Sequence, residues 1–234
     1  LEDFKKAGIH TQYILTSESE ETGQAFITVD EAGQNTILVY GGANMTLSAT
    51  DVEMSVDAFI GADFVVAQLE VPFEAIEQAF KIARKQNITT VLNPAPAIEL
   101  PKSLLELTDI IIPNETEAEL LTGISINNES DMKETATYFL DLGISAVLIT
   151  LGEQGTYCAY QEQYKMIPAC NVKAIDTTAA GDTFIGAFLS ELNKDLSNLE
   201  SAIRLANQAS SLTVQRKGAQ ASIPTRKEVE AEYN

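Results

Sequence analysis

Cysteine and histidine are scarce in this sequence. It has two cysteines, Cys158 and Cys170, and one histidine, His10, among 234 residues. One cysteine pair in a chain of this length is not a disulfide framework, and with a single histidine it does not make a typical structural zinc site. We interpret both cysteines as free thiols of a reducing cytoplasm. No acidic partner of His10 can be identified from its spacing to other residues, so a Ser–His–Asp mechanism has little support.

Positive charge is also scarce. The chain has 15 Lys and Arg against 34 Asp and Glu, which gives a formal net charge of −19 and a pI of about 4.3. Such an acidic surface repels nucleic-acid phosphates and anionic lipids, so we expect no nucleic acid and no membrane among its partners. A nucleotide is not excluded, because backbone N–H groups and a metal ion bind phosphates without a basic surface.

Long apolar runs and a signal-peptide pattern are missing from the sequence. No stretch reaches the ~18 consecutive apolar residues of a membrane-spanning helix. With 45% hydrophobic and 21% charged residues, the composition is typical of a globular protein, which we expect in the cytoplasm. The chain begins with Leu1 rather than Met, and we expect it to be a fragment or a processed product.

Alternating apolar and polar residues open the chain. Residues 10–15, 25–29 and 36–40 predict three strands, with a hairpin turn at Asp30–Asn35. We therefore expect residues 1–45 to form a small β region.

Beyond about residue 50, apolar strands alternate with amphipathic helices. Strands are predicted over 64–69, 89–93, 110–112 and 146–150, helices over 73–86, 114–121, 132–142, 181–192 and 199–215, and a β-hairpin over 157–167. Near-continuous apolar strands of this kind are typical of parallel strands covered on both faces. The sequence therefore predicts, over 46–234, an α/β domain with a mostly parallel central sheet.

The motif with the most specific chemistry is Asp176-Thr177-Thr178-Ala179-Ala180-Gly181-Asp182-Thr183, which leads into an amphipathic helix. Free N–H groups at a helix start can bind an anion, and Gly181 lets it approach closely. Asp182 falls in the first turn, where the helix dipole favours its ionised form. Beside a bound phosphate, such a carboxylate can accept the proton of an attacking hydroxyl. Alternatively, Asp182 and Thr183 merely cap or charge the helix.

Three further candidates follow predicted strands, where open α/β sheets gather ligands. Asn114 and Glu117 are spaced either as a capping box or as a pair that orients magnesium-bound water near a triphosphate. The two glycines of Thr150–Gly155 let backbone pass close to a nucleotide, although the spacing alone favours an ordinary turn. Glu70 follows the strand over 64–69, as a substrate contact or a solvated loop carboxylate.

Taken in order, these segments resemble the ribokinase-like sugar kinase family, from Ala7 to about Val229. The stretch Asp176–Asp182 is typical of the whole family, whereas Asn93-Pro94-Ala95-Pro96-Ala97 and Arg216-Lys217-Gly218-Ala219-Gln220 are typical of its ribose-specific members. The resemblance implies a ribokinase-like fold with a small β lid, and ATP-dependent phosphorylation of D-ribose at the 5-hydroxyl. Related kinases of fructose, deoxyribose or nucleosides, and a non-catalytic nucleotide-responsive protein, are the alternatives.

The resemblance also implies a role for each candidate residue. Asp182 is the base and contacts the sugar together with Glu70, Ala180 and Gly181 form the anion hole, and Glu117 is associated with the magnesium that accompanies ATP. The residues implied for ATP binding are Asn114, Thr150, Leu151, Gly152, Glu153, Gln154, Gly155, Gly181 and Asn207. Those implied for an activating monovalent cation, usually potassium, are Asp176, Thr178, Thr213, Arg216, Gly218 and Ser222, acting largely through backbone carbonyls.

Two wider features follow from the resemblance. The β lid is expected to close over the sugar and to pair with a second copy of the chain, which makes a homodimer. The family also begins with a further strand–helix portion that carries sugar contacts and is absent from these 234 residues. We therefore expect this chain to hold the catalytic and nucleotide-binding part and to lack most sugar contacts.

Overall fold

The central sheet contains six strands in the order of the sequence. The computed structural model describes residues 1–29 and 35–233. The strands are β3 (Phe64–Ala67), β4 (Thr89–Leu92), β5 (Ile110–Ile111), β6 (Ala146–Thr150), β7 (Gly155–Tyr160) and β8 (Gln163–Pro168). Strands β3 to β6 are parallel to one another, and the hairpin β7–β8 extends the sheet antiparallel to β6. The predicted mostly parallel α/β sheet is confirmed.

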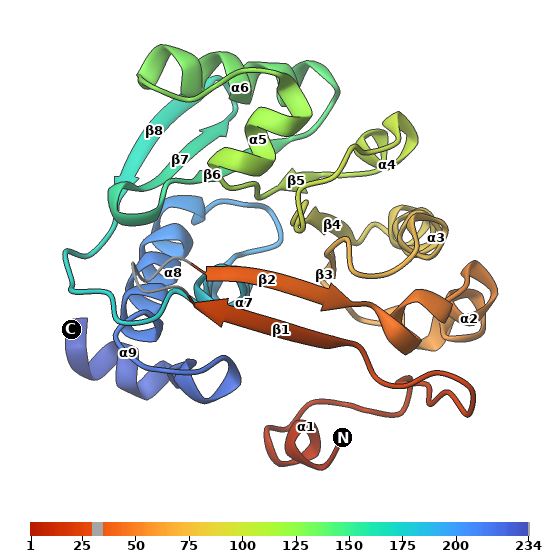
Figure 1. The fold of residues 1–234 in the computed structure, drawn as a ribbon. Helices are drawn as coiled ribbons and strands as arrows, with labels where there is room; N and C mark the ends of the chain where they lie inside the picture. Colours follow the sequence, from red (N-terminus) through yellow and green to blue (C-terminus); the bar gives the residue numbers. More distant parts are fainter. Residues whose placement is uncertain (30–34, 234) are drawn as a thin grey trace.

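Helices connect the parallel strands and complete the chain (Figure 1). They are α1 (Glu2–Lys6), α2 (Ala49–Met54), α3 (Phe73–Lys85), α4 (Lys102–Glu106), α5 (Glu115–Thr122), α6 (Glu129–Asp141), α7 (Ala180–Glu191), α8 (Leu199–Thr213) and α9 (Arg226–Tyr233). Short 3-10 helices lie at η1 (Gly42–Thr46), η2 (Val56–Phe59), η3 (Gly152–Gln154) and η4 (Gln220–Ser222).

The core lies on both faces of the sheet. Consecutive strand residues point to opposite faces, so Ile110 packs with Phe188 of α7, whereas the next residue, Ile111, packs with Phe139 of α6. Helices α7 and α8 cover the first face, and α3, α4 and α6 cover the second (Figure 1). Burial on both faces explains why these strands are apolar at nearly every position.

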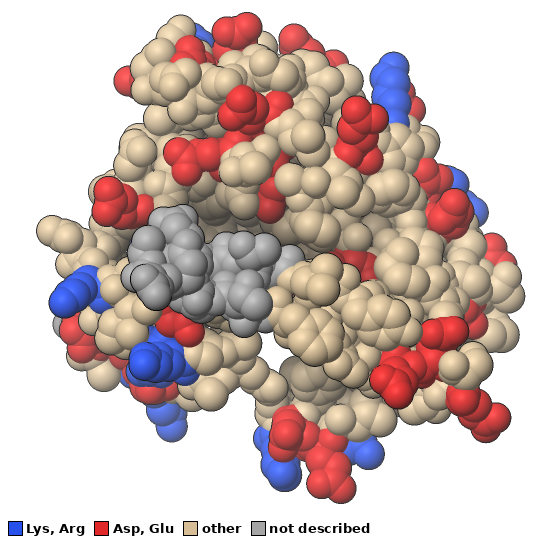
Figure 2. Space-filling model, in the orientation of Figure 1, with Lys and Arg blue, Asp and Glu red and all other residues tan. Residues whose placement is uncertain are grey.

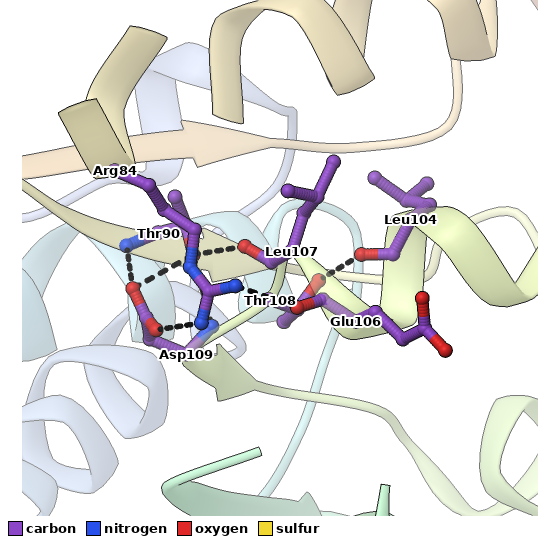
Figure 3. Close-up of polar contacts among 7 residues, drawn as sticks. All are labelled: Arg84, Thr90, Leu104, Glu106, Leu107, Thr108 and Asp109. Carbon is purple, nitrogen blue, oxygen red and sulfur yellow. Dashed lines mark hydrogen bonds and ion pairs between the residues drawn. The ribbon is translucent and has the colours of Figure 1, made fainter. Parts of the chain in front are cut away.

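At the amino ends of the parallel strands, a polar cluster joins β4 to β5 (Figure 3). The Thr90 N–H donates to Asp109 Oδ2 at 2.9 Å, and the Asp109 N–H donates to Thr90 Oγ1 at 2.9 Å. Arg84 of α3 donates to Asp109 Oδ1 at 3.3 Å and to the Glu106 carbonyl at 2.8 Å. These contacts pair the polar groups of the cluster with one another. They hold β4 and β5 together at the edge of the sheet opposite to the carboxyl ends of the parallel strands.

A separate sheet of two antiparallel strands, β1 (Gln24–Val29) and β2 (Asn35–Tyr40), lies near the amino terminus, red and orange in Figure 1. It contains two of the three strands predicted there. The turn predicted at Asp30–Asn35 lies outside the described residues except for Asn35, which is the first residue of β2. The third prediction, a strand over 10–15, is wrong. Within the described residues β1 pairs with β2 alone, so residues 10–15 have no neighbouring strand to bond their N–H and C=O groups.

The surface agrees with the acidic composition. On the face shown in Figure 2, acidic side chains are scattered over the whole area, whereas Lys and Arg lie mostly near its margins. Among the described residues, no helix combines the length and the apolar character that crossing a bilayer requires.

Candidate active site

The start of α7 has the geometry of an anion site. Helix α7 begins at Ala180, after Ala179 in the left-handed conformation with φ 61°. No side chain of the described residues caps this helix start, and a Cβ built on Gly181 would have nothing within 4 Å. The Ala180 N–H already donates to the Thr177 carbonyl at 3.3 Å, so the N–H groups of Gly181 and Asp182 are the ones that this helix start offers to an anion. A non-glycine residue in the left-handed region costs of order 1 kcal/mol or more and is typical of functional loops.

Asp182 lies in the first turn of α7 and is exposed. Its Oδ1 accepts a hydrogen bond of 3.0 Å from Gln68 Nε2, at the carboxyl end of β3. The carboxylate is thus held beside the start of α7 and remains open to solvent, a position compatible with a general base for a hydroxyl substrate. Glu70, two residues beyond Gln68 at the same edge of the sheet, is also exposed.

Asn114 and Glu117 form the capping box of α5 that their spacing predicts. Asn114 N and Nδ2 donate to the two Glu117 oxygens, each at 2.9 Å, and Glu117 N donates to Asn114 Oδ1 at 2.8 Å. Glu117 is 5% exposed, and burial raises the pKa of its carboxyl, an effect that the Asn114 N–H opposes. A bridge between Asn114 and Thr150 sets this helix start beside the carboxyl end of β6.

The segment Thr150–Gly155 turns sharply from β6 into β7 through η3. Gly152, Glu153 and Gln154 are exposed, whereas Leu151 is buried. Gly155 has φ 112°, and a Cβ there would lie 2.2 Å from the Ile167 carbonyl oxygen. The structure therefore requires glycine at 155 for packing, while Gly152 leaves the backbone open to a ligand.

Asn207 of α8 is buried against the β7–β8 hairpin. It accepts from Thr156 Oγ1 at 3.0 Å and donates to the Ile167 and Pro168 carbonyls at 3.1 and 3.2 Å. Its side-chain amide therefore anchors the helix beside Gly155.

The residues implied for a monovalent cation come together in part. Asp176 accepts from the N–H groups of Thr178 and Gly218, each at 3.0 Å, so its carboxylate joins two loops. The buried Thr213 donates to Thr183 Oγ1 at 3.0 Å, next to Asp182 in the chain. Arg216 directs its guanidinium away, to Glu228 at 2.8 Å, which leaves its backbone carbonyl as the available ligand. The buried Ser222 donates to the Ala219 carbonyl at 2.6 Å.

Gln68 and Asn93 are polar residues of this edge to which the sequence assigned no role. Each directly follows a strand, β3 and β4 respectively, and Gln68 Nε2 donates to Asn93 Oδ1 at 3.0 Å. The signal that could have found them is their position, since the carboxyl ends of parallel strands meet at one edge.

Known proteins resemble this chain over almost its whole length. The model of the pfkB family of carbohydrate kinases matches residues 1–226. Ribokinase of Staphylococcus aureus (strain COL) is 64% identical over 229 residues, which cover 98% of this chain and 75% of that protein. The structure of ribokinase from Thermotoga maritima matches with a TM-score of 0.84 and 35% identity, over 98% of this chain and 74% of the other. Ribokinase of Arabidopsis thaliana, solved with ribose and ATP, matches with a TM-score of 0.85 and 33% identity, over 96% of this chain and 73% of the other.

Proposed function

This chain belongs to the pfkB family of carbohydrate kinases, and we propose that it transfers the γ-phosphoryl group of ATP to the 5-hydroxyl of D-ribose, giving ribose 5-phosphate. Membership of the family makes it a kinase that phosphorylates a sugar hydroxyl. The choice of ribose is supported by the name and identity of the Staphylococcus aureus relative and by the ribose in the Arabidopsis structure.

The observation that carries the mechanism is the start of α7. Asp182, exposed beside uncapped helix N–H groups, accepts the proton of the sugar hydroxyl as that oxygen attacks phosphorus. The N–H groups around Ala180 and Gly181 receive the transferring phosphoryl group, aided by the positive end of the helix dipole. Glu70 contacts the sugar from the carboxyl end of β3.

The nucleotide lies beyond α7 in this proposal, along the carboxyl end of β6 and the adjoining start of β7. Asn114 binds its phosphate end, and the exposed backbone of Gly152–Gln154 lines it, as the open space at Gly152 supports. Asn207 supports this site indirectly, because its side-chain amide fixes the β7–β8 hairpin. The residues of the nucleotide site are Asn114, Thr150, Leu151, Gly152, Glu153, Gln154, Gly155, Gly181 and Asn207.

A divalent metal accompanies ATP in this family of reactions, and magnesium bound to the phosphates neutralises their charge during transfer. Both Glu117 oxygens already accept hydrogen bonds from Asn114. Each carboxylate oxygen has a second lone pair, so Glu117 fits as the acceptor of metal-bound water rather than as a direct ligand.

We also propose an activating potassium ion held by the loops around Asp176, Thr178, Thr213, Arg216, Gly218 and Ser222. Backbone carbonyl and hydroxyl oxygens are the ligands that such an ion prefers. The hydrogen bonds from Thr178 and Gly218 to Asp176 support this placement, because they gather the two loops.

Residues 1–45 are proposed as a β lid on the kinase core of residues 46–234, and the lid as the contact of a homodimer. Phe26 and Leu38 lie directly opposite each other on one face of the two-stranded sheet and are 54% and 69% exposed. A two-stranded sheet is marginal by itself, so a partner that covers this face would stabilise it.

We propose the cytoplasm as the compartment, with no nucleic acid and no membrane among the partners. Both Cys158 and Cys170 are free thiols, which suits a reducing compartment.

The test is ADP release with ATP, magnesium and potassium across D-ribose, fructose, deoxyribose and adenosine. Release with ribose well above the other acceptors is the expected result. Asp182→Asn should then reduce turnover at least ~100-fold while ATP affinity stays nearly unchanged, as for a lost general base. Release with another acceptor alone would contradict the choice of ribose, and near-normal turnover of Asp182→Asn would contradict the base.

A further inference from the structure

A chain of side-chain hydrogen bonds runs from the middle of the sheet to Asp182. Asn93 Nδ2 donates to the Ile112 carbonyl at 2.8 Å. Gln68 Nε2 donates both to Asn93 Oδ1 and to Asp182 Oδ1, each at 3.0 Å. The chain therefore links the carboxyl ends of β3, β4 and β5 to the first turn of α7.

The chemistry of the groups permits one orientation for each amide in this chain. A backbone carbonyl only accepts, so Asn93 must direct its NH2 group to Ile112 and its oxygen to Gln68. An ionised carboxylate also only accepts, so Gln68 must direct its NH2 group to Asp182. The two hydrogens of that single NH2 group supply the two bonds of Gln68.

The strand register fixes Gln68 in place. Ala67 and Leu92 are partners in the β3–β4 pair, so Gln68 and Asn93 are the next residues in register. The Asn93 N–H donates to the Ala67 carbonyl at 3.0 Å, and the Leu69 N–H donates to the Ala95 carbonyl at 2.8 Å. Backbone bonds on both sides of Gln68 thus hold its amide at the end of a rigid sheet.

We infer that Gln68, oriented by Asn93, is a positioning residue for the kinase reaction, which holds the Asp182 carboxylate by Oδ1 and so leaves Oδ2 for the sugar hydroxyl. The inference rests on the proposed role of Asp182 as base. Among the described residues, Gln68 is the side chain that donates to this carboxylate, which is otherwise exposed at the end of a helix. Without this bond the carboxylate rotates freely, and misplacement by 1 Å costs up to about 100-fold in rate.

Two substitutions test the inference. Gln68→Leu should lower kcat roughly 10- to 100-fold and leave the KM for ATP unchanged, because it removes the donor to the Asp182 carboxylate and leaves the nucleotide site intact. Gln68→Glu keeps the size of the side chain but replaces the donor with a carboxylate that only accepts, so its kcat should fall at least as far. Asn93→Ala combined with Gln68→Leu should add little to the single effects, because both break one chain.

The matched control is Gln78→Leu, since Gln78 Nε2 donates to the Glu53 carboxylate at 2.9 Å on the surface and away from the site. This variant should keep the kcat and the KM for ATP of the unchanged protein. Gln68 variants with unchanged kcat would overturn the inference, even where Asp182→Asn abolishes turnover. Near-normal turnover of Asp182→Asn would instead refute the base itself, so the two failures are distinguishable.

Discussion

Asp176 joins two loops with its two carboxylate oxygens. Oδ1 accepts from the Thr178 N–H and Oδ2 from the Gly218 N–H. The Gly218 N–H, followed by the Thr178 side chain and N–H, lowers the pKa of Asp176 to about 2. Its ionised form is thus the one that the folded protein prefers, and the loops proposed to bind potassium depend on this single residue.

Asp176→Asn should lower the melting temperature at neutral pH and raise the potassium concentration for half-maximal activation by roughly 10-fold. The Asp176 carboxylate accepts the Thr178 and Gly218 N–H groups with one oxygen each. The amide of an asparagine has a single oxygen, so it cannot accept both in this way. Because the folded pKa lies below the unfolded value of about 3.9, the stabilisation is complete above pH 4 and is lost as pH falls through 2. The melting temperatures of Asp176→Asn and the unchanged protein, measured from pH 2 to 7, should therefore converge as the pH approaches 2.

A suitable control is Asp195→Asn, because Asp195 accepts from the Ser197 N–H at 3.0 Å within one loop. This variant should not change potassium activation. If Asp176→Asn and the unchanged protein responded equally to potassium, or if a large organic cation replaced potassium without loss of activity, the cation proposal would be refuted.

Single residues differ in how far the sequence predicts them. The capping box of Asn114 and Glu117 is local, and spacing alone gave it. The contact of Gln68 with Asp182 spans 114 residues, and no periodicity in the sequence carries that information. The catalytic and binding roles of the site residues stay predictions, derived from resemblance and compatible with the positions that the fold gives them.

The hairpin of β7 and β8 depends on one backbone conformation. Gly155, at the start of β7, has φ 112°, and a Cβ there would lie 2.2 Å from the Ile167 oxygen and 2.5 Å from the Ala169 nitrogen. Both neighbours are backbone atoms, which cannot swing aside as a side chain does.

Gly155→Ala should therefore destabilise the protein by at least ~2 kcal/mol, the sum of backbone strain and a steric clash. Urea unfolding measures the loss. Gly186→Ala in α7 is the control: a Cβ there meets nothing within 4 Å, and alanine suits a helix better than glycine, so we expect equal or higher stability. Equal stability of the Gly155→Ala variant and the unchanged protein would show that the turn relaxes at little cost.

At this scale, all the long helices were predicted, whereas most of the short ones were not. Helices α3, α6, α7 and α8 and all strands of the central sheet lie where the apolar pattern predicts them, within a few residues. Helices α1, α2, α4 and α9 were missed because five to eight residues show too little of a 3.6-residue period, although α5, also of eight residues, was predicted. The strand predicted over 10–15 does not form. Alternation of apolar and polar residues shows only which side chains share a face, whereas a strand also needs a neighbouring strand to bond its N–H and C=O groups.

For the molecule as a whole, the exposed face of the lid is the feature with a direct test. Phe26 and Leu38 form an apolar pair on that face. Leu38→Lys should convert the proposed dimer to monomer at micromolar concentration, because it would bury a charge in the contact. Sedimentation velocity at several concentrations measures the change.

Val39→Lys is the comparison, since residue 39 points to the opposite face and is also exposed. It should leave the association state unchanged. A monomer for the unchanged protein at every concentration would refute the dimer, and an effect of Val39→Lys alone would assign the contact to the other face.

The sequential strand order bears on how the protein is made. Each strand of the central sheet pairs with the one synthesised just before it, so the sheet can grow as the chain leaves the ribosome. Asp182, by contrast, must return across 114 residues to Gln68 at the first strand of that sheet. A nascent chain thus forms the sheet before the carboxylate proposed as the base is in place, so ATP turnover has to wait until α7 has packed against the sheet.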